Sequence, residues 1–466
     1  MVCRKETNHP MNLYHYRSIH TALLEIENGT FHYSDRKELN DPLEGHIQMY
    51  WQGDRPAWQG LFRNYICSLC NCIELYLLQR SFEEIDERAV MLDVHDMDDT
   101  PFGRLLGEVG DLFLADPDVS GMIDELARSD EQVFARSLRF RLQLLHEKAF
   151  AICMRSMKWN GLIPQDEPED YIPTEKSLAN LYGPDVSKID SKARNALLEV
   201  AAHMLEDVLE SRFLKEEMES ENSYSQRQLW YSVRLWFPAM YVSRLREMMY
   251  QKAYVVCFSA EPANSVMWGN YAENHSGVCL VYETKTKDGR EYLGVKTGKA
   301  YTSGHTIFSF RDDEVKPVRY NNAPIKRNAF ESMGRLSLKQ VSSWLVNSEG
   351  EKSRLYDRYM EENWRDTYWD DYTDKYCTKL DPWAYEKEYR LRLDDFLHEH
   401  TWEERMVEYD PAALTGVIFG VRTSEYDRQR IIKAIQKSGR SLKEFNFFQC
   451  EFDDEAYQFR IRRKMI

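Results

Sequence analysis

The sequence predicts an α+β protein in which a small mixed or antiparallel β-sheet core is interrupted by a large all-α insertion. Three observations predict it: short strand patterns near the N-terminus, helical periodicity from about residue 55 to 250, and a return to strand patterns afterwards. We therefore divide the chain into a first part of the α+β core (1–54), a helical insertion (55–250) and a second part of the core (251–466), which contains a helical segment over 325–378.

The first part of the core is predicted to form strand, helix, strand and loop. Residues 13–18 alternate as a strand does, and residues 19–26 carry an apolar helix face. Asn28-Gly29 ends that helix, because glycine adopts the left-handed conformation found at many helix C-termini. Residues 30–34 form a second short strand, and Asn40-Asp41-Pro42 then starts a loop.

The insertion shows the 3.6-residue spacing of packed helices. Apolar residues recur at this spacing from 197 to 213, and an aromatic-rich face runs from 229 to 245. The acidic, proline-containing segment 164–173 is predicted to be a surface loop. The sequence leaves open whether the insertion is a partner surface, a pocket lid or a dimer interface.

Strand patterns return after residue 250. Two strands, 254–259 and 277–282, flank a helix-like stretch from 264 to 274. The remaining predicted elements of this part are strands over 315–320, 385–393, 416–421 and 445–452 and a helix over 427–438.

The composition limits the classes of protein to which this chain can belong. The chain has 466 residues, 43% of them hydrophobic, a formal net charge of −16 and nine cysteines. No apolar run approaches the roughly 20 residues of a membrane span, and the N-terminus lacks the apolar segment of a signal peptide. The odd number of cysteines favours free thiols in a reducing compartment, so we expect a soluble cytoplasmic protein. The acidic charge argues against nucleic acid as a partner of the whole surface.

Several familiar motifs are absent from the sequence. It contains no GxGxxG, GxxxxGK[ST], GxSxG or HExxH element, which removes the usual signals of dinucleotide-binding, P-loop, hydrolase and zinc-protease folds. Cys67, Cys70 and Cys72 lie close together, but a zinc site needs a fourth ligand and no second pair is evident. We therefore predict no metal site.

The strongest chemical pattern is Trp383 to Arg392, which is predicted to be one strand. Period-2 alternation then places Glu386, Glu388, Arg390 and Arg392 on one face. Two neighbouring carboxylates repel, which raises the pKa of one of them, and the arginines supply compensating charge. Taken alone, the pattern also fits a solvated strand face with cross-strand salt bridges.

Two other segments carry residue types suited to a ligand pocket. One holds Asn40, Asp41 and Glu44, and the other holds Trp268, Tyr271 and His275. Aromatic, imidazole and amide side chains suit a pocket that stacks a flat ring and hydrogen-bonds its edges. The alternative is that Trp268 and Tyr271 are core residues at helical spacing.

Together these segments resemble a bacterial family known mainly as a domain of unknown function. The motifs that carry this resemblance occur in order as Tyr14-His15-Tyr16-Arg17, Asn40 to Glu44, Cys257 to Gly277, and Trp383 to Arg390. The resemblance covers about 150 residues in pieces. The helical stretch from 55 to 250 lies outside it.

The order of elements also resembles the Arg–Ser–Glu class of ADP-ribosyltransferases. That resemblance implies that Arg17 contacts the phosphates or the nicotinamide ribose of NAD, and that Ser259 supports the nicotinamide side. It implies that Glu388 is the catalytic glutamate and that Glu386 assists the acceptor. His15 could instead fill the first-strand role, as in the histidine-containing branch of the superfamily. The complete set of predicted NAD-binding residues is Arg17, His15, Ser259, Trp268, Tyr271, His275, Asn40, Asp41, Glu44 and Arg390.

The resemblance thus predicts an NAD-dependent ADP-ribosyltransferase that modifies a protein or nucleic acid, as a bacterial toxin or anti-phage effector. NAD is its substrate, and a cognate inhibitor or partner protein would contact the helical insertion. Two other classes remain open. One is a non-catalytic nucleotide-binding sensor module, and the other is an NAD glycohydrolase or a nuclease, the latter requiring a divalent metal on its carboxylates.

Overall fold

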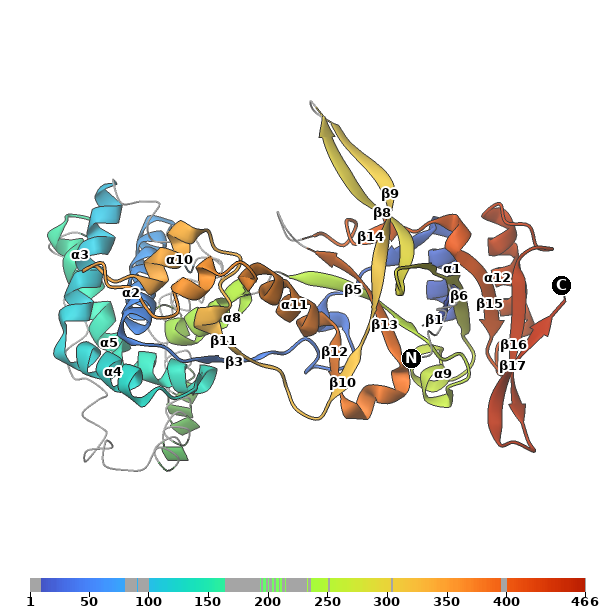
Figure 1. Cartoon of the computed structure of the whole chain (residues 1–466), viewed down its shortest axis with the longest axis horizontal. Helices are drawn as coiled ribbons and strands as arrows, with labels where there is room; N and C mark the ends of the chain where they lie inside the picture. Colours follow the sequence, from blue (N-terminus) through green and yellow to red (C-terminus); the bar gives the residue numbers. More distant parts are fainter. Residues whose placement is uncertain are drawn as a thin grey trace, which may run out of the picture. The chain divides into compact units, whose positions relative to one another are not determined.

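The computed structural model of the chain describes residues 10–79, 90, 100–163, 237–249, 252–302, 305–394 and 400–465, with scattered positions between 193 and 236 (Figure 1). The predicted loop 164–173 and much of the predicted helix faces at 197–213 and 229–236 lie outside the described residues. The chain divides into two compact units. The first comprises Met1–His46, Gln251–Ile325 and Asp371–Ile466, and the second Ile47–Tyr250 and Lys326–Asp370.

A ten-stranded sheet in the order β17-β16-β15-β6-β1-β5-β13-β9-β8-β7 forms the centre of the first unit. Its strands are β1 (Asn12–Arg17), β5 (Ala253–Ser259), β6 (Val278–Glu283), β7 (Lys285–Lys287), β8 (Arg290–Thr302), β9 (His305–Pro317), β13 (Glu388–Asp394), β15 (Leu414–Phe419), β16 (Asn446–Asp453) and β17 (Gln458–Lys464). Most neighbours are antiparallel, whereas β15 and β16 are parallel. The predicted α+β class is confirmed.

The sheet is larger than the small core that the sequence predicted. The predicted strand 315–320 covers only the end of β9 and most of β10 (Arg319–Asn321). The rest of the long β8–β9 hairpin and the C-terminal strand β17 were not predicted, and both extend the sheet at its margins (Figure 1). Short pairs formed by β2 (Thr30–His32) with β14 (Met406–Glu408) and by β10 (Arg319–Asn321) with β12 (Thr378–Leu380) complete the strands of this unit.

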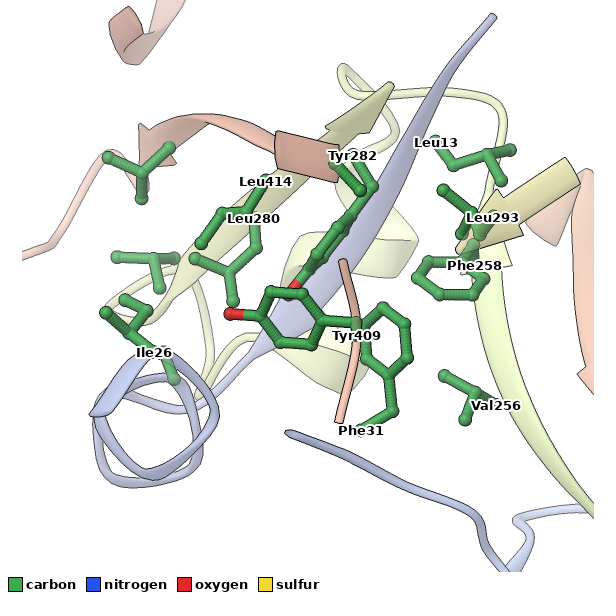
Figure 2. Packing of buried hydrophobic residues seen from close by; sticks show 14 of the residues in the cluster. Leu13, Ile26, Phe31, Val256, Phe258, Leu280, Tyr282, Leu293, Tyr409 and Leu414 are labelled. Carbon is green, nitrogen blue, oxygen red and sulfur yellow. The ribbon is translucent and has the colours of Figure 1, made fainter. Parts of the chain in front are cut away.

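Alternating side chains divide the core of the first unit between the two faces of the sheet. On one face Leu13, Phe31, Phe258, Tyr282 and Tyr409 form an aromatic-rich cluster (Figure 2). The helices α1 (Ile19–Asn28) and α12 (Glu425–Lys437) contribute apolar residues to it. As predicted, α1 ends at Gly29, whose φ of 64° is left-handed.

The opposite face of the sheet carries a smaller cluster. Tyr16, Cys279 and Ile418 pack there against Met267 and Trp268 of α9 (Ser265–Tyr271). Successive residues of β1 therefore serve opposite faces, as the period-2 pattern of a strand requires.

The second unit consists of helices and a small sheet. Its helices include α2 (Arg55–Gln79), α3 (Pro101–Ala115), α4 (Pro117–Ser129), α5 (Ala135–Trp159), α8 (Phe237–Met249) and α10 (Leu338–Leu345). Its sheet is formed by β3 (Gln48–Trp51), β4 (Val133–Phe134) and β11 (Lys326–Asn328). None of the helices in the described ranges combines the length and apolarity that a bilayer crossing requires.

Residues 326–370, which the sequence analysis grouped with the second part of the core, pack with the helical unit instead. The Phe330 ring meets the edge of Trp58 at a centroid distance of 5.3 Å, and α10 lies so close to α2 that a Cβ at Gly60 would overlap the Trp344 carbonyl. Only part of the predicted helical segment 325–378 is helical, namely α10 and α11 (Trp364–Tyr376), besides short 3-10 turns.

Candidate functional site

The sheet of the first unit opens between β1 and β5. These neighbours pair at one position only, Tyr14 opposite Ser259, whereas β1 follows β6 over its whole length. Beyond that position Ser34, from the loop after β2, takes the place of β1, and its N–H donates to the Val255 carbonyl at 2.9 Å. The two strands therefore separate, and a gap is left between their edges.

A cavity of about 240 Å³ occupies this opening. Tyr14–Arg17 of β1 line one side and Val255–Ser259 of β5 line the other. Consecutive residues of both strands face it because the cavity lies at the parted strand edges rather than above one face of the sheet. Its remaining wall includes Asn40, Glu44, Tyr271, Lys379, Glu386 and Glu388.

One wall of the cavity is organised by Glu25, a buried residue of α1. Its Oε1 lies 2.9 Å from His15 Nδ1, and its Oε2 accepts from Arg17 Nε at 2.9 Å. The Tyr282 hydroxyl donates to Oε1 at 2.6 Å. Both His15 and Arg17 line the cavity, but Glu25 itself does not.

The charges of this wall follow from burial and pairing. Burial and the Arg17 guanidinium lower the pKa of His15, so the imidazole is neutral at pH 7. Burial opposes a charge on Glu25, but the Arg17 guanidinium and the hydrogen bonds with His15 and Tyr282 outweigh it and lower the pKa of Glu25 to about 2. An ionised carboxylate thus holds a neutral imidazole and a guanidinium.

The opposite wall is a buried cluster of three carboxylates and two cations. Lys379 Nζ lies 2.7 Å from Glu386 Oε2 and 3.2 Å from both Glu388 Oε2 and Glu44 Oε2. Arg390 donates from Nε and Nη2 to the two oxygens of Glu388, at 2.7 and 2.8 Å, and forms an ion pair with Glu44. Buried charges require such pairing, because an unpaired ion in a protein interior is costly.

The cluster pushes the pKa values of its two candidate catalytic carboxyls apart. Burial raises the pKa of Glu386, whose Oε1 accepts from the Tyr271 hydroxyl at 2.5 Å. Burial would also raise the pKa of Glu388, but Arg390 and Lys379 outweigh it and lower that pKa to about 2. One carboxyl can therefore take up or release a proton while its neighbour stays ionised, a combination suited to acid–base chemistry beside a stabilising charge.

The predicted strand from 383 to 392 needs correction. Asp381–Glu386 form a 3-10 helix, Lys387 has a left-handed φ of 45°, and β13 starts at Glu388. Glu386 and Glu388 therefore do not share a strand face, although both reach Lys379. The turn at Lys387 brings the two carboxylates together. Arg392 lies further along β13 and pairs with Asp394 instead.

Ser259 supports this turn through the backbone. Its hydroxyl donates to the Glu386 carbonyl at 2.7 Å and accepts from the Glu261 N–H at 3.0 Å. Ser259 also stands opposite Glu388 in the pairing of β5 with β13. The serine thus lies on a central strand and lines the cavity, with its side chain bonded to main-chain atoms.

The structure brings some of the other predicted site residues to the cavity and not others. Asn40, Glu44 and Tyr271 line it. Asp41 shapes the loop, since its Oδ1 accepts from the Leu43 N–H at 2.9 Å. Arg390 is buried and does not line the cavity, but it pairs with Glu388 and Glu44, which do.

Two predicted residues lie elsewhere. The Trp268 indole is fully buried, donates to the Pro262 carbonyl at 2.8 Å and packs edge-on against Tyr16, which agrees with the core alternative. His275 has a left-handed φ of 72°, and its carbonyl accepts from the Arg422 N–H at 3.0 Å. Neither lines the cavity.

Sequence reasoning missed Glu25 and Lys379. Glu25 stands among apolar residues on α1 and is buried, and an acid on the apolar side of a helix is the signal that would have identified it. Lys379 follows the buried Cys377 by two residues on β12, but nothing local in the sequence marks a lysine that three carboxylates will surround.

The three clustered cysteines belong to the second unit. Cys67, Cys70 and Cys72 all lie buried on α2 and form no disulfide within the described part of the chain, and burial raises the pKa of Cys67 to about 12. Such thiols are poor nucleophiles and poor ligands in this state. Among the described residues, no group of three or more His, Cys, Asp or Glu side chains is arranged to hold a metal ion.

The fold and site thus define an α+β domain with a cavity where the neighbouring strands β1 and β5 separate. Residues 267–391 match the family described as "Protein of unknown function (DUF2971)", so the chain contains a DUF2971 domain. This range includes Tyr271, Lys379, Glu386 and Glu388, whereas the wall formed by β1 and α1 lies outside it. No curated protein and no solved structure matches the chain.

Proposed function

We propose that this protein is an NAD-dependent ADP-ribosyltransferase that transfers ADP-ribose from NAD to a protein or nucleic-acid acceptor. One observation carries the proposal: Arg17, Ser259 and Glu388, which the resemblance had singled out, lie on the neighbouring strands β1, β5 and β13 and line one cavity. These residues come from three distant parts of the chain. The local patterns that suggested each of them do not by themselves place all three in one cavity.

The charges of the cavity suit this reaction. As the bond between nicotinamide and ribose breaks, its electron pair goes to the ring nitrogen and positive charge develops on the ribose. The ionised Glu388 stabilises that charge. The acceptor then forms a bond to the same ribose carbon and loses a proton, which Glu386 takes up. The raised pKa of Glu386 suits it to that step.

The opposite wall suits the anionic part of NAD. The Arg17 side chain is 26% exposed and is held through Nε, and among the described residues its terminal nitrogens have no hydrogen-bond or ion-pair partner. A guanidinium fork binds two phosphate oxygens at once, which makes arginine well suited to a pyrophosphate.

One observation favours an alternative function, a module that binds a nucleotide without catalysis. Arg390 and Lys379 already contact both oxygens of Glu388, so this carboxylate is occupied before any ligand binds, which favours such a non-catalytic module. A nuclease is less well supported, because Lys379 and Arg390 occupy the carboxylate oxygens that a divalent metal would need. An NAD glycohydrolase would use the same residues and differ only in accepting water.

The test is incubation of the full chain and cell extract with NAD labelled on its adenylate phosphate. Wild type should label a macromolecule, and Glu388→Gln should reduce that labelling by about 100-fold or more, since it removes the charge that meets the developing cation. Free ADP-ribose without a labelled acceptor would identify a glycohydrolase. NAD binding without turnover would identify a sensor module.

Asp394→Asn is the matched control. Asp394 is also an acid on β13 paired with an arginine two residues away, and it does not line the cavity. This variant should keep labelling within a few-fold of wild type. Labelling by Glu388→Gln at the level of Asp394→Asn would refute the catalytic assignment, provided that thermal melting shows both variants folded.

We extend the proposal to a toxin or anti-phage effector. Expression of the wild-type chain in a bacterial host should then slow growth, and Glu388→Gln should relieve the effect at equal protein level. Equal growth of cells expressing wild type and Glu388→Gln would count against this biological role while leaving the enzymatic test decisive for activity.

A further inference from the structure

Glu25 of α1 stands apart from the proposed catalytic pair, Glu386 and Glu388. This carboxylate is 5% exposed, does not line the cavity, and yet contacts two side chains that do. It binds His15 through one oxygen and Arg17 through the other, both at 2.9 Å. Neither the family match nor the resemblance assigns it a role.

The contact with His15 fixes a tautomer. An ionised carboxylate can only accept hydrogen bonds, so His15 Nδ1 must carry a proton. A neutral imidazole then has no proton on Nε2, which makes that nitrogen an acceptor. Within the described part of the chain Nε2 has no hydrogen-bond partner, and His15 lines the cavity.

The contact with Arg17 fixes an orientation. Glu25 engages Nε, and among the described residues the two terminal nitrogens of Arg17 have no hydrogen-bond or ion-pair partner. A single carboxylate therefore presents an imidazole acceptor and the two terminal NH2 groups of a guanidinium side by side on β1.

We propose that Glu25 is a positioning residue for the ligand site: it holds His15 in the Nδ1–H tautomer and directs the free N–H groups of Arg17 toward an anionic group of the ligand. The inference rests on the proposed function for its ligand, NAD, but its geometry concerns the free protein alone.

Packing alone does not explain this carboxylate. Glu25 stands among buried apolar residues of α1, and the ring of Tyr282, which donates to it, belongs to the aromatic-rich cluster, so an apolar residue could fill such a site without the cost of burying a charge. A carboxylate here is better accounted for by the two polar groups it orients.

The first experiment observes the imidazole directly in the full chain. Long-range proton–nitrogen NMR of histidine-labelled protein, with His15 assigned by its loss in His15→Asn, should show the neutral Nδ1–H tautomer at pH 7. In Glu25→Gln the amide can accept from only one of the two partners, because its other atom is a donor. We expect either the other tautomer or a mixture. An Nε2–H tautomer or an imidazolium in wild type overturns the proposal.

The second experiment measures binding by calorimetry, with NAD and with inorganic pyrophosphate as probes. Glu25→Gln should weaken both by about 10- to 100-fold, the range for losing a hydrogen bond to a charged group. In an Arg17→Ala background the same substitution should have a much smaller effect, since coupled residues are not additive. Full additivity of the two substitutions would overturn the proposal.

Tyr282→Phe is the control for a merely structural role. It removes another hydrogen bond to the same Glu25 oxygen but leaves His15 and Arg17 in contact with Glu25. We expect affinity within about 3-fold of wild type at a comparable loss of thermal stability. Equal weakening by Tyr282→Phe and Glu25→Gln would show that Glu25 acts through stability only.

The probes separate this inference from the proposed function. Pyrophosphate binding that responds to Glu25→Gln, without NAD binding by wild type, supports the positioning role and refutes NAD as ligand. If wild type binds neither probe, the proposed ligand is wrong and the tautomer of His15 in the free protein decides the role of Glu25.

Discussion

The two walls of the cavity use buried carboxylates in different ways. On the β1 wall one carboxylate, Glu25, serves a neutral imidazole and a guanidinium. On the opposite wall three carboxylates share Lys379 and Arg390. The first arrangement is balanced in charge and fixes orientation, whereas the second has one more acid than cations.

The excess acid explains why Glu386 differs from its neighbours. A buried cluster with surplus negative charge lowers its free energy by binding a proton or a cationic group. Glu386 is the member whose pKa is raised, and Tyr271 already hydrogen-bonds it. In the proposed function, the β1 wall positions the ligand and the opposite wall exchanges protons and charge with it.

The largest expected effect comes from removing the shared cation. Lys379→Met leaves three buried carboxylates with one arginine, and should destabilise the fold by about 3–5 kcal/mol, the range for breaking a buried ion pair. Urea unfolding measures it. Lys387→Met is the control, because Lys387 is 59% exposed and pairs with Glu261 only at the surface. Similar losses in both variants would contradict the buried network.

Acidic pH should reduce the stability that the buried carboxylates of both walls contribute to the fold. The pKa of Glu25 and of Glu388 falls from an ordinary 4.5 to about 2 on folding, so their stabilisation is present above 4.5 and is lost as pH falls toward 2. For each, the loss is on the order of 3 kcal/mol, because a tenfold change in proton affinity is worth about 1.4 kcal/mol.

Glu386 acts in the opposite direction. Because folding raises its pKa, its contribution is full below 4.5 and is lost as pH rises through the folded value. The free energy of unfolding, measured by denaturation across pH 2–7, should therefore fall steeply as the pH becomes acidic. In Glu25→Gln this acid limb should be shallower. An unchanged limb in that variant would contradict the charge assigned to Glu25.

A smaller effect should follow from reducing the excess acid. Glu44→Gln leaves two carboxylates for two cations, so the loss of its ion pairs with Lys379 and Arg390 is offset by relieved repulsion, and we expect a cost below about 1.5 kcal/mol. Glu388→Gln should cost more, because both oxygens of Glu388 accept from Arg390. Thermal unfolding of the two variants compares them, and the reverse order would contradict this account of the cluster.

The smallest effect is expected at the turn between the glutamates. Lys387 has a left-handed φ of 45°, which glycine adopts without strain, so Lys387→Gly should change stability by less than about 1 kcal/mol. Lys387→Val should cost about 1–2 kcal/mol and displace Glu386 from Lys379. Equal stability of the two variants in thermal unfolding would show that the turn does not hold the pair.

Much of the secondary structure was predictable because its signals are local. Ser18 accepts a hydrogen bond from Thr21 at the start of α1 and Gly29 ends it, and the strands β1, β5 and β6 follow runs of apolar and aromatic residues. The boundary at Glu388 was missed, since alternation alone does not reveal that Lys387 reverses the backbone.

Much of the candidate site was also present in the sequence, as residue types in three separated segments. Arg17, Glu44, Ser259, Tyr271, Glu386 and Glu388 were identified from these segments and line the cavity. The pattern could not distinguish Trp268, which belongs to the core, from Tyr271, three residues later, because both stand at helical spacing.

The sequence by itself determined the α+β class, the local elements and the acidic and aromatic composition of the site, since these depend on neighbours along the chain. Only the tertiary structure decided how the charges pair. Glu25 meets Tyr282, 257 residues away, Ser34 replaces β1 beside Val255, and Lys379 reaches three glutamates. Such pairings arise from long-range packing and low-dielectric burial, which no local pattern encodes.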